Sequence, residues 1–305
     1  MKNVFISILN FNGKKNTLDC IESLKKIKIS DFILTIVVID NGSSEKLNLE
    51  DGIFEKIKLK VIKNKQNLGF SGGHNVGIKY GLANGADYIL ILNNDTYVHK
   101  DFLEELLKVS EEDREIGIVV PKIYFAPEFE FHKNRYSKNE QGKVFWYAGG
   151  EMDWKNVIGH NRGVDIVDKG QFDLTEETEI ATGCCMMIRK DVFEKVGMLD
   201  EKYFLYYEDS DLGMRAKKVG YKIMYSPKAI IWHKNAGSAG GSGSVLQDYY
   251  ITRNRLIFGM KYASFRSKFA LARESLSLLL NGREWQKRGV WDFYSVRFGK
   301  GSFQA

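Results

Sequence analysis

The stretch Tyr88-Ile-Leu-Ile-Leu-Asn-Asn-Asp95 is the part of the chain that says most about its fold. It begins with an apolar run typical of a buried strand, and a helical pattern opens soon after it, near Asp101. Asn93, Asn94 and Asp95 would then stand at the edge of a sheet, where carboxylate and amide oxygens can hold a hard cation that bridges to the phosphates of a substrate. The alternative is an Asx-rich turn, because Asn and Asp favour turns.

Strand-like and helical patterns alternate in the sequence on both sides of this stretch. Apolar runs typical of strands span residues 4–9, 32–39, 59–62 and 88–92, and apolar stripes at helical spacing span residues 16–27 and 73–83. This alternation indicates the α/β class: a Rossmann-like, mostly parallel central sheet flanked by helices, with ligands at the carboxyl ends of its strands.

The rest of the chain is less regular until about residue 180. Residues 118–120 suit a further strand, and residues 124–178 are expected to form loops and short strands that cover a cleft. The elements expected after them are a strand over 182–189, a helix capped by Asp191, a helix over 209–219, strands over 222–225 and 230–232, a flexible Gly/Ser loop over 237–244, and helices to the C-terminus.

Size and composition suit one large domain, alone or with an extension. The chain has 305 residues, a mass of 34.9 kDa and 44% hydrophobic residues, which is ample for a core. Its first apolar run is too short for a signal peptide, and no run approaches the roughly 18 apolar residues of a membrane-spanning helix. Cys20, Cys184 and Cys185 lack a CxxC spacing and predict reduced core residues of a cytoplasmic protein.

Positive charge is concentrated near the C-terminus. The chain carries a net charge of +6, and residues 253–305 hold eleven Lys/Arg against three Asp/Glu. Lys261, Arg266, Lys268 and Arg273 flank a partly apolar helical segment that runs through Leu271 to residue 280. The pattern favours an anionic partner, and we expect a membrane surface rather than nucleic acid, with the protein lying peripherally at the inner face of the plasma membrane. A helical pair packed on the rest of the protein is the alternative.

Two polar residues mark a candidate ligand pocket after the first two strands. Asp40 closes the second strand, where an acid can accept hydrogen bonds from a base N–H or a ribose hydroxyl. The segment Asn10-Phe-Asn12-Gly13 closes the first strand and should border the same pocket, with Asn12 as its candidate contact. No GxGxxG follows the first strand, which argues against NAD and FAD.

A glycine-rich segment, Asn67-Leu-Gly-Phe-Ser-Gly-Gly-His-Asn-Val-Gly77, leads into a helix. Its small residues would let the backbone approach a ligand at the helix N-terminus, with Asn67, Gly69 and Asn75 as candidate contacts. A plain glycine-rich helix entry is the alternative, and the lack of a following Gly-Lys-Ser/Thr excludes a Walker A loop.

Three acids and one histidine supply the remaining candidates. Glu208, Asp209 and Asp211 open a predicted helix, whose dipole favours negative charge there. Capping explains one or two of them, and another could emerge into a cleft and act as a general base. His233 closes a later strand. Such a histidine is usually a surface residue or one whose ring nitrogens have hydrogen-bond partners. Its imidazole could also complete the cation site begun by Asp95.

In order and spacing, these motifs resemble family 2 glycosyltransferases of the GT-A fold, above all the bacterial rhamnosyltransferase-like branch that builds cell-surface polysaccharide. The matching segments are NFNG, VVIDNGS, NLGFSGGHNVG, LNNDT, TGCCMMIRKDVFEKVGMLDEKYFLYYEDSDLGMR, GY and WH, and the resemblance covers roughly residues 4–255. It implies a nucleotide-sugar donor, a divalent cation (Mg²⁺ or Mn²⁺) and inversion at the anomeric carbon. We therefore expect a catalytic domain over residues 1–260, with a nucleotide-binding half (1–100) and an acceptor and catalytic half (101–260), followed by a basic helical extension over 261–305.

The resemblance also implies a role for each matching residue. Asn12 and Asp40 would contact the nucleoside, and Asn93-Asn94-Asp95 would take the place of the DxD motif. Asp95 and His233 would bind the metal, and Asp209 would be the base of the Glu208-Asp209 pair. Tyr249, Tyr250 and Arg253 would lie near the diphosphate. The chain departs from the family pattern in two ways. Asn93 replaces the first acid of DxD, which lowers the negative charge of the site, and the GxxRW-type motif of processive members is absent, which favours transfer of a single sugar.

The expected function is an inverting, metal-dependent transfer of one sugar from a nucleotide-sugar donor, dTDP-rhamnose or a UDP-sugar. Its acceptor would be a hydroxyl group of a glycan or lipid-linked molecule in cell-surface polysaccharide synthesis. One alternative is a sugar-1-phosphate nucleotidyltransferase. Such an enzyme would require a GxGxR-type loop after the first strand, where this chain has Asn10-Phe-Asn-Gly13. The other is a catalytically inactive, glycan-binding homologue.

Overall fold

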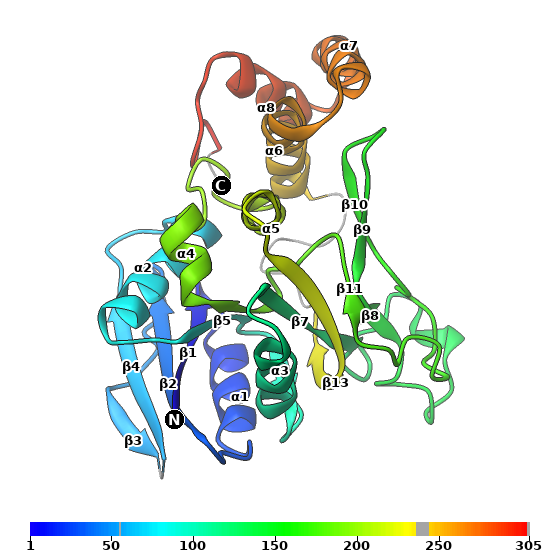
Figure 1. Ribbon diagram of the computed structural model, residues 1–305. Helices are drawn as coiled ribbons and strands as arrows, with labels where there is room; N and C mark the ends of the chain where they lie inside the picture. The colour runs from blue at the N-terminus through cyan, green and yellow to red at the C-terminus, as the bar shows by residue number, and fades with distance from the viewer. Residues whose placement is uncertain (55, 236–243, 304–305) are drawn as a thin grey trace.

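The computed structural model of the chain describes residues 1–54, 56–235 and 244–303. In these residues an eleven-stranded sheet has the order β11-β13-β7-β12-β5-β1-β2-β4-β3, with β6 paired to β13 and β8 to β7 (Figure 1). The neighbouring parallel strands at its centre are β5 (Tyr88–Asn93), β1 (Lys2–Asn10), β2 (Phe32–Asp40) and β4 (Ile57–Lys63). These strands confirm the predicted Rossmann-like α/β sheet.

The second half of the sheet mixes strand directions. β12 (Cys185–Arg189) lies antiparallel between β5 and β7 (Ile116–Phe125), and β13 (Lys222–His233) runs parallel to β7. The shorter strands of this sheet are β3 (Gly52–Phe54), β6 (Thr96–Val98), β8 (Phe145–Tyr147) and β11 (Glu176–Glu177). A separate antiparallel hairpin is formed by β9 (Gly150–Asp153) and β10 (Ile158–Asn161).

The helices of the described residues are α1 (Lys14–Leu24), α2 (Gly69–Ala83), α3 (Phe102–Glu112), α4 (Lys190–Val196), α5 (Glu208–Lys218), α6 (Val245–Tyr262), α7 (Phe265–Asn281) and α8 (Glu284–Tyr294), with a short 3-10 turn over Lys133–Arg135. The last three helices contact one another and gather at one end of the molecule, away from the parallel strands (Figure 1).

Helix α2 packs closely on the parallel strands because glycines line its inner face. A Cβ atom added at Gly73 would lie 2.3 Å from Leu9 Cδ1, and one at Gly77 would lie 2.4 Å from Ser7 Oγ. Ser7 and Leu9 share one face of β1, since side chains alternate along a strand. Asn10 points to the opposite face, where its Oδ1 accepts hydrogen bonds from the start of α1. Helices α1 and α2 therefore cover opposite faces of the sheet.

Some predicted elements differ from the structure in detail. The two strands expected over 222–225 and 230–232 are one strand, β13, whose pairing with β7 shifts between Ser226 and Ile230. Pro227 lies in this interval and has no N–H to join the ladder. Asp191 lies in the first turn of α4, and Arg189 holds the N-cap position. The predicted loop over residues 237–244 lies outside the described residues, except for Ser244, the N-cap of α6.

The C-terminal helices share a hydrophobic core with the second half of the chain. Leu271 on α7 and Val290 on α8 are buried in one cluster with Tyr203 and Phe258. Helix α6 ends at Tyr262, close to the expected boundary at residue 260, and that boundary stays a prediction. Within the described ranges, no helix combines the length and the apolar character that crossing a membrane requires.

Candidate active site

Polar residues stand where three neighbouring parallel strands end. In the strand register, Asn10 is opposite Asp40 and Leu9 is opposite Asn93, so β2, β1 and β5 bring these residues to one edge of the sheet. The buried Asp40 carboxylate accepts hydrogen bonds from Asn10 Nδ2 (3.2 Å) and from the Ser43 N–H (3.4 Å). A carboxylate held in this way at a strand end suits recognition of a base N–H or a ribose hydroxyl.

Asn12 shapes the loops beside Asp40. Its backbone is left-handed (φ 53°), a conformation in which Asn is enriched. Its Oδ1 accepts hydrogen bonds from the N–H and the hydroxyl of Ser44 at 2.9 and 3.0 Å, and its N–H donates to Ser43 Oγ (3.0 Å). Asn12 is exposed and ties the loop after β1 to the loop after β2.

The turn between β5 and β6 brings Asp95 to His233. Strand β6 pairs antiparallel with β13, with Thr96 opposite His233, and Asp95 Oδ1 lies 3.1 Å from His233 Nε2. Both side chains are largely buried. The other ring nitrogen of His233, Nδ1, is buried and has no hydrogen-bond partner among the described residues. The Trp146 ring packs edge-on against the imidazole, with 4.7 Å between the ring centroids.

One carboxylate and one imidazole fit a divalent cation that a ligand helps to hold. Mg²⁺ is usually bound by one or two carboxylates together with substrate phosphates, and Mn²⁺ also accepts oxygen ligands. In the described part of the chain, no three His, Cys, Asp or Glu side chains gather into a metal site. The Asp95–His233 pair therefore suits a cation shared with a phosphate-bearing molecule.

The two asparagines before Asp95 are tied to neighbouring elements. Asn94 Nδ2 donates to Thr17 Oγ1 on α1 (2.9 Å), and the Asn93 N–H donates to the carbonyl of Cys184 (2.9 Å). The Asn93 side chain is half-buried at the strand end. The same residues thus form an Asx-rich turn and present Asp95, so the two interpretations of this tripeptide are compatible.

Asp209 reaches the same edge from the second half of the chain. Its Oδ2 accepts a hydrogen bond from the Gly183 N–H (2.8 Å), and Gly183 directly precedes Cys184, which is bonded to Asn93. Its Oδ1 accepts from the Ser210 N–H (2.6 Å). Burial raises the pKa of Asp209 above its ordinary value, and the hydrogen bonds offset part of that rise. A carboxylate with a raised pKa at a strand edge suits a general base.

Glu208 is the more deeply buried of the two neighbouring acids. Among the described residues, its Oε2 atom has no hydrogen-bond partner. Burial first, and then the charge of Asp209, raise the pKa of Glu208 well above its ordinary value. Asp209 differs from Glu208 because two backbone N–H groups donate to its carboxylate and favour the ionised form that a base needs.

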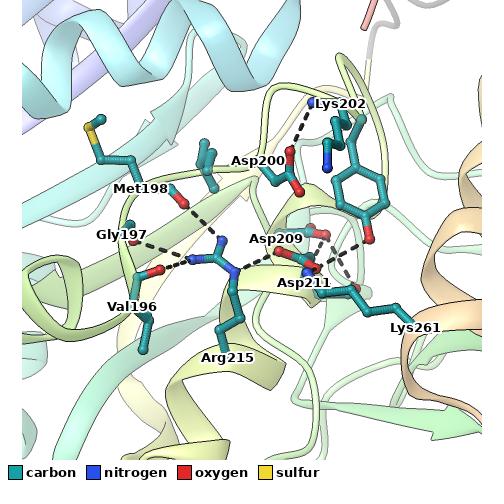
Figure 2. A network of polar contacts seen from close by, with 12 residues as sticks. Val196, Gly197, Met198, Asp200, Lys202, Asp209, Asp211, Arg215 and Lys261 are labelled. Carbon is teal, nitrogen blue, oxygen red and sulfur yellow. Dashed lines mark hydrogen bonds and ion pairs between the residues drawn. The ribbon is translucent and has the colours of Figure 1, made fainter. Parts of the chain in front are cut away.

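Asp211 is held in a polar network that anchors α5 (Figure 2). Its carboxylate accepts hydrogen bonds from Arg215 Nε (2.7 Å), Lys261 Nζ (2.6 Å) and the Tyr203 and Tyr262 hydroxyls (3.2 and 2.8 Å). Burial by itself would raise its pKa, but Lys261 and Arg215 outweigh burial and hold the pKa below its ordinary value. Lys261, expected from the sequence to flank a membrane-binding segment, instead pairs with Asp211 in this network.

The glycine-rich segment is approached by another part of the chain. The N–H groups of Phe70 and Ser71 donate to the Phe204 carbonyl at 2.6 and 3.3 Å. A Cβ atom at Gly69, which has a φ of 74°, would lie 2.5 Å from the Phe204 ring and carbonyl. The close backbone approach expected for a ligand is made here by Phe204, in the segment that leads to Glu208.

Asn67 and Asn75 hold loops around the site. Asn67 Oδ1 accepts hydrogen bonds from Asn41 Nδ2 (3.0 Å) and the Gly69 N–H (2.8 Å). The Asn75 amide bonds both the carbonyl and the N–H of Leu199, at 2.9 and 3.1 Å. These internal bonds join α2 to the end of β2 and to the segment after α4.

Tyr250 and Arg253 are buried beneath the last described residues. The Tyr250 hydroxyl donates to the Lys300 carbonyl (3.1 Å), and the Arg253 guanidinium donates to the carbonyls of Tyr203 (3.0 Å) and Arg297 (3.5 Å). The segment after α8 folds back over α6, so these polar groups bind the chain itself. The position near the diphosphate that the resemblance implies stays a prediction.

Asn10 belongs to the segment that was expected to border the pocket, and its Nδ2 donates to the Asp40 carboxylate. One residue with a role at this edge was not among the candidates from the sequence. Gly183 binds Asp209 across 26 residues of sequence, and a Thr-Gly pair before a strand does not reveal such a contact.

Comparison with solved structures identifies the class of fold. The structure of GalNAc-T7 with UDP, GalNAc and Mn²⁺ matches this chain with a TM-score of 0.61 at 16% sequence identity. The match covers 97% of this chain, which spans 58% of the length of that one. The sheet and its helices therefore define a GT-A fold.

The family follows from the sequence comparison. The family model described as Glycosyl transferase family 2 matches residues 5–197, more than half of the chain. This chain belongs to that family and is a glycosyltransferase.

Two curated relatives are similar over most of their length. The low-salt glycan biosynthesis hexosyltransferase of Haloferax volcanii is 27% identical over 254 residues, which are 82% of this chain and 75% of the relative. The dTDP-rhamnosyl transferase of Shigella flexneri is 23% identical over 262 residues, which are 84% of this chain and 79% of the relative. Both relatives are transferases of sugars, in agreement with the family.

Proposed function

We propose that this glycosyltransferase moves a single sugar, with inversion, from a nucleotide-sugar donor to a hydroxyl group of a glycan or lipid-linked acceptor in cell-surface polysaccharide synthesis. One observation carries the proposal. The buried Asp40 carboxylate, the Asp95–His233 pair and the Asp209 carboxylate are linked to consecutive strand ends of one sheet edge. This arrangement provides for a nucleoside, a diphosphate and an incoming hydroxyl group side by side.

The donor half of the proposal rests on the first strands. The nucleoside would bind at Asp40 and Asn12, and Asp95 with His233 would hold a divalent cation, Mg²⁺ or Mn²⁺, that neutralises the charge of the departing diphosphate. The pairing of UDP with Mn²⁺ in the GalNAc-T7 structure supports this choice of cofactor. Among donors, similarity to a dTDP-rhamnosyl transferase favours dTDP-rhamnose, and a UDP-sugar is the alternative.

In the chemical step, the Asp209 carboxylate would act as the base that accepts the proton of the acceptor hydroxyl group. The acceptor hydroxyl oxygen forms a bond to C1 of the donor sugar while the bond from C1 to the diphosphate oxygen breaks on the opposite face. Attack from that face inverts C1. The hydroxyl proton passes to the Asp209 carboxylate, and the bonding electron pair leaves with the nucleoside diphosphate.

A thermal-shift panel of nucleotide sugars tests the donor assignment. With Mg²⁺ or Mn²⁺ present, at least one of dTDP-rhamnose, UDP-glucose and UDP-N-acetylglucosamine should raise the melting temperature, because a ligand at 100 times its Kd stabilises the native state by about 2.7 kcal/mol. Asp40→Asn should reduce this rise. Asp51→Asn is the matched control, since that exposed carboxylate pairs with Lys60 (2.5 Å).

The same samples show whether the bound donor is used. Slow release of free sugar from the donor by the wild-type protein would support a transferase and speak against an inactive glycan-binding protein. If no nucleotide sugar shifts the melting temperature, or if Asp40→Asn and the control respond alike, the donor assignment is wrong.

We also propose that the protein acts in the cytoplasm at an anionic membrane surface, which α7 contacts. Phe265, Phe269, Leu276 and Leu280 follow one another at spacings of four, seven and four residues, so they share one side of the helix. They are exposed, Phe265 to 85% and Leu280 to 76%. Leu271, on the opposite side, is buried in the core with α6. The helix thus packs on the protein by one face and presents an apolar stripe by the other.

Basic residues near this stripe favour an anionic membrane as the partner. Arg266 and Arg273 on α7 are exposed, and the residues from 253 onward carry eleven basic against three acidic side chains. An apolar stripe with basic neighbours is the pattern of helices that lie in the surface of anionic membranes. Such a surface is also where a lipid-linked acceptor would be located.

Vesicle sedimentation tests this surface. The protein should bind phosphatidylglycerol vesicles more strongly than phosphatidylcholine vesicles, and rising salt should weaken the binding because it screens the charges. Phe269→Ser with Leu280→Ser should abolish it, whereas Ile53→Ser, an equally exposed apolar side chain on β3, should not. Equal binding to both vesicles would contradict the role of charge. If the wild-type protein forms a dimer in solution and the double variant is a monomer, the stripe is a contact with a second copy of the chain.

A further inference from the structure

A cavity of about 280 Å³ lies between the β9–β10 hairpin, α5 and α6. It is lined by Met152, Trp154, Glu179, Ile180, Ser210, Met214, Lys217 and Phe258. None of these lining residues is Asn12, Asp40, Asp95 or His233, the residues of the candidate nucleoside and cation sites.

The cavity adjoins the candidate base through α5. Ser210, Met214 and Lys217 are spaced four and three residues apart, so they line one side of that helix. Ser210 directly follows Asp209, and its N–H donates to Asp209 Oδ1 (2.6 Å), with its Oγ 3.3 Å from the same oxygen. A molecule in the cavity would thus contact the residue that is bonded to the Asp209 carboxylate.

The lining combines a flat apolar wall with a few oriented polar groups. The Trp154 ring stacks on the Phe258 ring with 6.0 Å between centroids and 16° between planes. The Glu179 carboxylate is fixed by the Met152 N–H (2.8 Å), and Lys217 Nζ donates to the Thr178 carbonyl (3.3 Å). Lys217 Nζ also lies 3.6 Å from Glu177 Oε1. The lining thus includes three residues with a carboxylate, an ammonium and a hydroxyl group: Glu179, Lys217 and Ser210.

This lining matches the chemistry of a sugar ring. A pyranose has C–H faces that pack on an aromatic ring and a rim of hydroxyl groups that pair with charged and hydroxyl side chains. Ligand pockets are mostly apolar with a few placed polar groups, and their volumes range from roughly 300 to 1,000 Å³. At about 280 Å³ this cavity is at the small end of that range, so it suits one sugar ring rather than a chain of sugars.

We propose that this cavity binds one sugar ring of the acceptor and holds its hydroxyl group toward Asp209. The proposal rests on the proposed glycosyl transfer and names the class of acceptor: a molecule that already carries a sugar, rather than a bare lipid or a protein side chain. Trp154 would support the C–H face of the ring, and Glu179 and Lys217 would select its hydroxyl pattern. These three side chains are positioning and specificity residues, and the proton transfer stays with Asp209.

Ligand-observed NMR on the full chain tests the cavity. A panel of methyl glycosides of glucose, galactose, mannose and N-acetylglucosamine serves as the probe, with saturation transfer from the protein as the readout. At least one glycoside should receive saturation, and Trp154→Ala and Glu179→Gln should each weaken its binding about tenfold. Trp291→Ala is the matched control, because Trp291 is exposed on α8 and lies outside the cavity. If Trp154→Ala does not fold, Lys217→Met provides the second test within the same lining.

The outcomes separate this inference from the proposed function. Donor binding is measured in the same samples by thermal shift. If donors bind but no glycoside does, or if glycoside binding survives the cavity variants unchanged, the sugar subsite is wrong while the donor assignment stands. If glycosides bind in the cavity and no nucleotide sugar binds, the proposed transfer is wrong. A stronger response to an alkyl chain than to any glycoside would assign the cavity to the lipid part of an acceptor and overturn the inference.

Discussion

Asp209→Asn should lower the rate of sugar transfer by about 10²- to 10⁴-fold while nucleotide-sugar affinity stays within a few-fold of wild type. Asparagine keeps the shape of the side chain and can still accept the hydrogen bond that Gly183 N–H donates, but it cannot take a proton at neutral pH. The interaction that is lost acts in the transition state and not in donor binding. Single-turnover transfer and donor titration of the same preparation measure the two quantities separately.

The pH dependence of transfer gives a second readout of the same group. A base must be ionised before it accepts the acceptor proton, and burial raises the pKa of Asp209 above its ordinary value of 3.8. The rate in the wild-type protein should therefore rise with pH through that raised pKa and fall below it. In Asp209→Asn this limb of the profile should vanish from the residual rate.

The neighbouring acids are the controls that the structure supplies. Asp211→Asn removes a charge that pairs with Arg215 and Lys261, and breaking such a buried pair costs about 3 kcal/mol of stability. Because the folded pKa of Asp211 is lowered, its contribution to stability is full above the ordinary Asp pKa and is lost as the pH falls through the folded pKa. Glu208→Gln should keep most of the transfer rate, since burial favours the neutral form of this carboxyl group and its Oε2 has no hydrogen-bond partner among the described residues.

These variants decide between the possible bases. Normal transfer by Asp209→Asn together with a dead Glu208→Gln or Asp211→Asn enzyme would show that the base is misassigned. Normal transfer by all three variants would show that the mechanism is wrong.

Removal of divalent cations by EDTA should abolish transfer, and added Mg²⁺ or Mn²⁺ should restore it. Asp95→Ala should lower the rate on the order of 10²- to 10³-fold, which is typical when stabilisation of a developing negative charge is lost. It should also weaken donor binding in the presence of the cation and leave donor binding in EDTA unchanged. Titration of a nucleotide sugar with and without EDTA checks this difference.

His233 and an exposed acid serve as comparisons for this second prediction. His233→Ala should show the same loss of cation-dependent donor binding, because its Nε2 lies 3.1 Å from Asp95 Oδ1. Asp113→Ala should behave as wild type, since that acid pairs with Lys222 at the surface. A wild-type rate of sugar transfer by Asp95→Ala in EDTA would show that the cation assignment is wrong.

Most of the nucleotide-binding half could be predicted from the sequence. Apolar runs decide where strands begin and end, so the positions of Asp40 and Asn93 at strand ends follow from local pattern alone. The same holds for α5, whose first residues include Glu208 and Asp209. The glycine-rich segment was harder to interpret, because its glycines serve both the packing of α2 on β1 and the approach of Phe204 to Gly69.

The tertiary structure decided which of these residues meet. Asp95 faces His233 because β6 pairs with β13 in one register, and a strand pattern carries no information about the register of a distant partner. Asp209 and Asp211 differ in role because one is bonded to Gly183 and the other to Lys261, both far away in the sequence.

The sequence by itself determined the class of fold, the family, and the residue types at the strand ends, because hydrophobic periodicity and motif order are local properties of the chain. Only the tertiary structure decided the partner of each acid, the burial of Arg253 under the C-terminal segment, and the face of α7 that stays exposed. These depend on packing between elements that are distant in the sequence, so no local pattern specifies them.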